Sequence, residues 1–203
     1  THGDVNGVGY EVIIKTFSDN RMMEVCTPIL YGTSKVASYH KKLLKNELTL
    51  TSIKDASGAM DKKFNVINIT NDEVKIDLGK STEVAGQLSL KSLDCACDDL
   101  MKNNVDVLVT APINKKNIQC KDFVFPGHTE YLSNKFNSDS LMMMVCDRIR
   151  IGIVTSHLAL REVPLKITKE MLLRKIEIMN TSLKQDFGIT MPKIAVLALN
   201  PHA

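Results

Sequence analysis

Polar and ionisable residues follow three apolar segments of this sequence, at the point where each segment ends. The apolar segments are Val105–Thr110, Ile149–Thr155 and Ile194–Leu199. The segments that follow them are Thr110–Lys115, Thr155–Leu158 and Asn200–His202. In open α/β sheets, ligands bind outside the carboxyl ends of the strands. We therefore expect the functional site at these three ends.

Two histidines, His157 and His202, occupy equivalent places after the second and third apolar segments. Neutral imidazoles in such places can converge on one divalent cation through their ring nitrogens. A catalytic metal normally takes about three protein ligands, so this pair leaves one ligand unassigned. His40 lies on a lysine-rich helix and is expected to be solvated.

His128 is a further candidate, because Gly127 allows close backbone approach and a hydroxyl and a carboxylate follow at Thr129 and Glu130. The alternative is structural: Thr129 with a nearby acid can cap a helix that begins near Tyr131. The two interpretations are equally supported by the pattern. They are also compatible, since helix N-termini attract anions.

Two weaker signals concern phosphate. The glycine-rich opening, Gly3–Gly9, fits neither G-x-G-x-x-G nor the P-loop spacing, so a tight strand-to-helix turn is the better interpretation. Lys115 and Lys116 can supply charge to a phosphate, but paired lysines in a loop are usually just solvated.

Composition excludes several classes of protein. With 26 basic and 23 acidic residues, the net charge of +3 implies no nucleic-acid or membrane surface. The five cysteines contain no C-x-x-C pair, which argues against a disulfide framework and a zinc ribbon and favours the reducing cytoplasm. No apolar run approaches a membrane span, and Thr1 opens directly onto a motif and not onto a basic, apolar leader, so no export signal is expected.

The order of predicted elements indicates an α/β fold with a largely parallel sheet and right-handed crossovers. Helical periodicity or capping predicts helices over residues 10–17, 35–45, 87–103 and 169–187, the last capped by Thr168 and closed by Gly188. Apolar or alternating runs predict strands over residues 26–31, 64–69, 105–110, 149–155 and 194–199. Both ends of the chain look cut, because no strand precedes Gly3 and the sequence stops at Ala203 just after a predicted strand.

Taken together, seven ordered segments resemble the 4-hydroxythreonine-4-phosphate dehydrogenase family of pyridoxal phosphate biosynthesis. They are Gly3–Gly9, Ala85–Gln87, Thr110–Lys115, Gly127–Glu130, Thr155–Val163, Phe187–Ile189 and Leu199–Ala203. The sequence departs from many members at Val5, Asn6 and Tyr10, where proline, alanine and proline are common, so the role of that loop is left open.

The resemblance implies two α/β/α domains with mostly parallel sheets, like those of isocitrate and isopropylmalate dehydrogenases. It implies a first domain over residues 1–126 and a second that starts at residues 127–203, with the remainder beyond Ala203. The family's active site lies in an interdomain cleft completed by the second subunit of a homodimer.

The family's residue roles carry over to four positions. His157 and His202 correspond to metal ligands, and the third histidine ligand lies beyond Ala203. His128 and Thr129 correspond to residues that contact the phosphorylated substrate, and His128 is our hypothesis for the proton acceptor. The resemblance implies NAD or NADP as cofactor, together with one divalent metal such as zinc, magnesium or cobalt; cofactor-binding residues stay unassigned.

The implied reaction is oxidation of 4-phosphohydroxy-L-threonine to 2-amino-3-oxo-4-phosphooxybutanoate, which decarboxylates to 3-amino-2-oxopropyl phosphate on the route to pyridoxine 5'-phosphate. One alternative is a paralogous dehydrogenase of threonate or erythronate 4-phosphate. A second is a metal- or substrate-binding fragment without turnover.

Overall fold

The computed structural model describes residues 1–202 and divides into two compact units, Thr1–Phe136 and Asn137–Ala203. The sequence placed the boundary after residue 126. The structure divides ten residues later because α5 (His128–Lys135) packs Tyr131 into an apolar cluster of the first unit, beside Leu93 and Phe123. His128 and Thr129 therefore belong to the first unit.

A three-stranded parallel sheet organises the first unit, with the order β1 (Ile29–Gly32), β3 (Phe64–Asn68), β2 (Leu50–Ile53). Leu30 of β1 pairs with Val66 of β3, in parallel register. This sheet agrees with the predicted α/β fold, although β2 was not foreseen.

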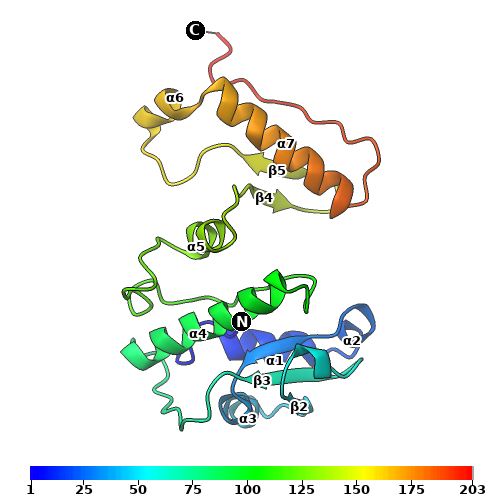
Figure 1. Cartoon of the computed structure of the whole chain (residues 1–203), viewed down its shortest axis with the longest axis vertical. Coiled ribbons are helices and arrows are strands. Elements are labelled where there is room, and N and C mark those ends of the chain that lie inside the picture. The colour runs from blue at the N-terminus through cyan, green and yellow to red at the C-terminus, as the bar shows by residue number, and fades with distance from the viewer. Residues whose placement is uncertain (203) are drawn as a thin grey trace. The chain divides into compact units, whose positions relative to one another are not determined.

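Helices flank the sheet on both sides. In Figure 1, α4 (Glu83–Met101) lies on one side and α3 (Ser34–Leu43) on the other. The side chain of Thr33 begins α3 by accepting a hydrogen bond from the Val36 N–H, and Thr82 does the same for α4. The remaining helices before the Gly127 turn are α1 (Gly9–Phe17), α2 (Met22–Val25) and the short 3-10 helix η1 (Ala56–Gly58).

Two predicted strands are not formed in the described residues. Residues 105–110 pair only with Thr1, whose amino group donates to the Val109 carbonyl at 2.7 Å, and Val109 is 77% exposed. Residues 194–199 carry no strand either, and Leu197 is 90% exposed. An apolar run becomes a central strand only when neighbouring strands pair with it, and no strand among residues 1–202 pairs with either of these two segments.

The second unit is a hairpin covered by a long helix. Strands β4 (Met142–Val145) and β5 (Arg150–Ile153) pair antiparallel, unlike the parallel sheet of the first unit. Thr168 caps α7 (Lys169–Gln185) and Gly188 takes a positive φ of 65° after it, as predicted. The connection between hairpin and α7 contains the 3-10 helix η2 (Leu160–Glu162) and α6 (Val163–Lys166). No helix among the described residues is long and apolar enough to span a bilayer.

Gly86 in α4 gives a first test of the packing. A Cβ at this position would lie 1.9 Å from the backbone oxygen of Asn117. Alanine is normally favoured over glycine inside a helix by about 1 kcal/mol. We nevertheless expect Gly86→Ala to lower the free energy of unfolding by roughly 1–3 kcal/mol, because the clash displaces the Asn117 backbone. Urea unfolding measures this.

The matched control is Gly58→Ala, because a Cβ at Gly58 meets nothing within 4 Å. Its free energy of unfolding should change by less than about 0.5 kcal/mol. Equal stabilities of the two variants would contradict the close approach of α4 to Asn117.

Candidate functional site

The two residues assigned to substrate binding begin helix α5. Gly127 is its N-cap, in extended backbone with φ of −175°, and no side chain makes a capping hydrogen bond there. The helix starts at His128, not near Tyr131 as the capping interpretation required. Because Thr129 does not cap the helix, its hydroxyl is left for another partner.

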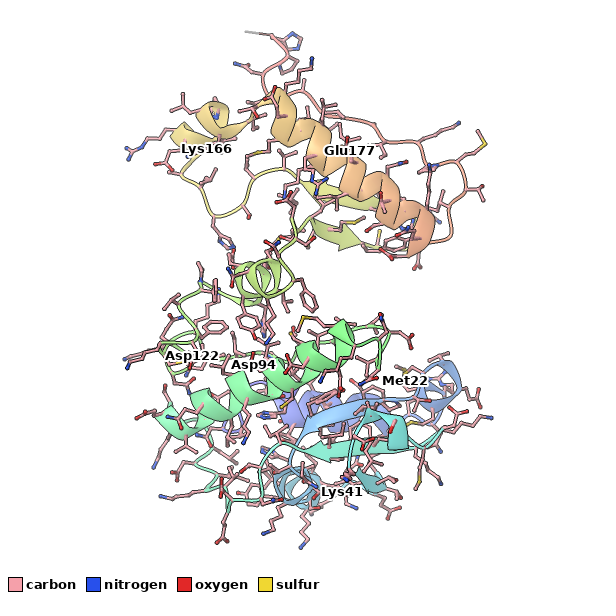
Figure 2. All side chains as sticks on the ribbon, in the orientation of Figure 1. Met22, Lys41, Asp94, Asp122, Lys166 and Glu177 are labelled. Atoms are coloured by element: carbon pink, nitrogen blue, oxygen red, sulfur yellow. The ribbon has the colours of Figure 1, made fainter. Side chains whose placement is uncertain are left out.

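Helix α4 fixes the position of α5. The Tyr131 ring stacks on Phe123 with centroids 5.2 Å apart, and its hydroxyl donates to the Asp94 carboxylate. Lys135 Nζ lies 3.0 Å from the same carboxylate and 3.1 Å from Asp98. Figure 2 marks Asp94 on α4. The last turns of α5 are therefore anchored, and its first turn, with His128 and Thr129, is held in place by them.

The His128 imidazole is half-buried, and its Nε2 atom is buried without a hydrogen-bond partner among the described residues. Burial lowers the pKa of His128, and the positive charge of Lys115 lowers it further. The ring is therefore neutral near pH 7, and a neutral imidazole can donate one hydrogen bond and accept another. A buried nitrogen without a partner is costly unless a ligand or water satisfies it.

The glycine-rich opening is a tight turn whose residues 2–6 are buried. The Asp4 N–H donates to the Pro112 carbonyl at 3.0 Å, and the N–H groups of Asn6 and Gly7 donate to Asp4. Gly3 has a φ of +69°, and a Cβ there would lie 2.3 Å from the Pro112 oxygen. Since these N–H groups are already paired, they are not available to a phosphate. The tight-turn interpretation of the sequence agrees with this geometry.

The three departures from the family pattern serve this turn. Asn6 is 3% exposed; its amide donates to the Lys80 carbonyl and the Thr82 hydroxyl, each at 3.0 Å. Val5 is 2% exposed and in the core, and Tyr10 is fully buried. These three residues therefore have a structural role: Val5 and Tyr10 pack beside the turn, and Asn6 hydrogen-bonds it to the chain before α4.

His40 corrects a prediction. It was expected to be solvated, but it is 3% exposed, its ring stacks on Tyr10 at 5.1 Å, and its Nε2 lies 3.1 Å from the Val5 carbonyl. The lysines of α3 are adjacent in sequence but lie on another face of the helix. His2 stacks on the other side of Tyr10 at 5.3 Å and is 1% exposed. Both rings support the core.

The two predicted metal ligands lie in the second unit. His157 follows β5 in an exposed segment and has a φ of +56°, which is uncommon for a residue with a side chain. His202 is also exposed, in a turn. The expectation that His202 follows a strand is wrong for the described structure, because residues 194–199 form none.

No group of three or more histidine, cysteine, aspartate or glutamate side chains suited to a metal occurs within residues 1–202. Two exposed imidazoles fit part of a metal site, since their ring nitrogens suit a divalent cation, but a site of about three ligands needs another donor.

Comparison with known proteins decides the family. Residues 24–203 match the family model described as pyridoxal phosphate biosynthetic protein PdxA. The chain belongs to this family. The resemblance seen in the sequence motifs is thereby confirmed.

Relatives within the PdxA family carry two names. The chain is 48% identical over 205 residues to a 4-hydroxythreonine-4-phosphate dehydrogenase of Bacteroides thetaiotaomicron, a match covering 100% of this chain and 56% of that protein. It is 32% identical to a putative D-threonate 4-phosphate dehydrogenase of Fusobacterium nucleatum, covering 99% of this chain and 61% of that protein. The chain thus spans little more than half the length of these relatives.

A solved structure supports the fold. The crystal structure of a 4-hydroxythreonine-4-phosphate dehydrogenase from Burkholderia phymatum superposes with a TM-score of 0.89 at 28% identity, covering 99% of this chain and 62% of that one. The α/β fold class predicted from the sequence is confirmed by this match.

Proposed function

We propose that this chain is the larger part of a dehydrogenase that oxidises 4-phosphohydroxy-L-threonine with NAD or NADP. The observation that carries the proposal is the 48% identity, over the whole chain, to a protein named for this activity. The product, 2-amino-3-oxo-4-phosphooxybutanoate, is a β-keto acid that loses carbon dioxide to give 3-amino-2-oxopropyl phosphate. A bound NAD or NADP would supply the hydride acceptor for this oxidation, and the hydroxyl proton would leave to a base.

His128 and Thr129 are the proposed substrate contacts. The neutral His128 ring offers a buried Nε2 without a partner, and Thr129 offers a hydroxyl not used for capping. We propose His128 as the proton acceptor as well, because a base must be unprotonated at the working pH, and burial favours that state.

His128→Asn tests the two roles of His128 separately. We expect kcat to fall by about 10²-fold or more if the ring accepts the proton, within the usual range for general base catalysis. The measurement is steady-state kinetics of the full-length protein, with Thr129→Val as the comparison that removes only a contact. Full turnover in His128→Asn would exclude the base, while a raised KM alone would leave a binding role.

His157 and His202 are the proposed ligands of one divalent cation, zinc, magnesium or cobalt, together with a ligand from outside the described residues. Such a cation supplies Lewis-acid polarisation of substrate oxygens. Neutral imidazoles favour zinc or cobalt over magnesium, which prefers oxygen ligands. We also propose a cytoplasmic homodimer; the cytoplasm is supported by the five free cysteines.

A second candidate, oxidation of D-threonate 4-phosphate, is favoured by the name of the Fusobacterium nucleatum relative. Reduction of NAD and NADP by full-length protein, measured with each substrate in turn, separates the two. A chelator should abolish the signal with the true substrate and added metal should restore it. No turnover of either substrate would favour a binding protein without catalysis.

A further inference from the structure

Lys115 lies against the first turn of α5. A Cβ built on Gly127 would lie 3.7 Å from Cε and 3.9 Å from Nζ of Lys115. The end of the lysine side chain therefore lies within van der Waals reach of the Gly127 turn, next to the start of α5 at His128. Lys115 takes part in none of the ion pairs found within residues 1–202. The Glu130 carboxylate lies at the same turn, with Oε2 3.8 Å from the same built Cβ, but it makes no ion pair with Lys115.

Hydrogen bonds on both sides of Lys115 hold the loop that carries it. Asn117 Nδ2 donates to the Asp4 carboxylate at 2.9 Å, and Asp4 is 6% exposed. On the other side of Lys115, Asn114 Nδ2 donates to the Ser81 hydroxyl at 3.1 Å, and its Oδ1 accepts from the Lys116 N–H at 3.0 Å. The backbone on both sides of Lys115 is therefore fixed, and its side chain starts from a defined position.

Three groups near the start of α5 have no hydrogen-bond or ion-pair partner among the described residues. They are the Lys115 ammonium, the buried His128 Nε2 and the uncapped start of α5. The ammonium is close enough to His128 for its charge to lower the pKa of the ring, in addition to the larger effect of burial. An oxyanion is the group that an ammonium and an imidazole N–H can hydrogen-bond together.

We propose that Lys115 is a further substrate-binding residue, whose ammonium holds an anionic group of the substrate, phosphate or carboxylate, beside His128. The assignment rests on the proposed function of this site and adds to it the residue that recognises charge. It also distinguishes the two adjacent lysines, because Lys115 is the one whose side chain is found against the Gly127 turn.

The test compares Lys115→Ala with Lys116→Ala in the full-length protein. We expect Lys115→Ala to raise KM for 4-phosphohydroxy-L-threonine by about tenfold or more, the usual effect of losing a hydrogen bond to a charged group. Its kcat should stay within about twofold, since ground state and transition state lose the same contact. Lys116→Ala should match the wild type, and Lys115→Arg should recover part of the loss. Equal KM values for Lys115→Ala and Lys116→Ala would overturn the proposal.

4-Hydroxy-L-threonine, which lacks the phosphate, identifies the anionic group. If Lys115 holds the phosphate, the penalty of Lys115→Ala disappears with this substrate; if it holds the carboxylate, the penalty persists. Calorimetric Kd values for 4-phosphohydroxy-L-threonine, measured in parallel, separate two failures. If the protein does not turn over the substrate but Lys115→Ala weakens binding, only the dehydrogenase function is refuted. If the protein turns over the substrate but Lys115→Ala leaves the Kd unchanged, only the role of Lys115 is refuted.

Discussion

Replacing both His157 and His202 with alanine in the full-length protein is expected to remove its stoichiometric divalent metal and most of its turnover. Each change removes one imidazole, and the remaining donor cannot hold a cation that needs about three protein ligands. The loss in kcat/KM should be on the order of a thousandfold, since Lewis-acid polarisation contributes several kcal/mol to such reactions. Metal content by mass spectrometry and NAD(P) reduction measure the two effects.

Cys146→Ala is the control for this double variant. Cys146 is an exposed thiol in the same unit, and hydrogen bonds from the Arg148 and Ile149 N–H groups lower its pKa, which makes it a potential adventitious ligand. Removing it should leave stoichiometric metal and turnover unchanged. Wild-type metal content in the double histidine variant would refute the assignment of both ligands.

Local sequence patterns correctly predicted the elements whose formation depends on residues within or next to the element itself. The helix over residues 169–187 needed only an apolar stripe, a threonine cap and a terminal glycine, and all three are present in α7. The strand predicted over residues 64–69 forms as β3 (Phe64–Asn68), because strands β1 and β2 pair with it on both sides. The stronger apolar run at 105–110 forms no strand, because strand formation depends on partners that the run itself does not encode.

In the candidate site, too, features set by neighbouring residues were predicted from the sequence, and features set by distant residues were not. The G-H-T-E motif pointed to His128 and Thr129 because glycine, imidazole and hydroxyl stand together in sequence. The hydrogen bond between Asp4 and Asn117 joins residues 113 positions apart, and no local pattern predicts it. The burial of His40 was missed for a related reason: the composition of a helix does not reveal which face it buries. Separating Lys115 from Lys116 also required the fold.

Acid is expected to destabilise the first unit, and replacing His2 with phenylalanine should reduce that sensitivity. Burial lowers the pKa of His2 from 6.5 to about 3. Below pH 6.5 the unfolded chain therefore binds a proton that the folded chain does not, so stability falls as the pH falls toward 3. The slope is about 1.4 kcal/mol per pH unit for one such group, or roughly 2 kcal/mol between pH 6.5 and pH 5.

Tyrosine fluorescence during urea unfolding at pH 7 and pH 5 measures this effect in the right unit. The sequence has no tryptophan, and its four tyrosines all precede residue 137, so the signal reports the first unit. His2→Phe keeps an aromatic ring against Tyr10 but cannot be protonated, and should lose roughly 2 kcal/mol less than the wild type over this interval. Tyr10→Phe, in the same stack, removes only the hydroxyl that accepts from the Thr33 N–H, so it should lower stability at both pH values and leave the slope unchanged. If His2→Phe and the wild type lose the same stability on acidification, the proton taken up on unfolding belongs to another group, and the stack is a packing feature alone.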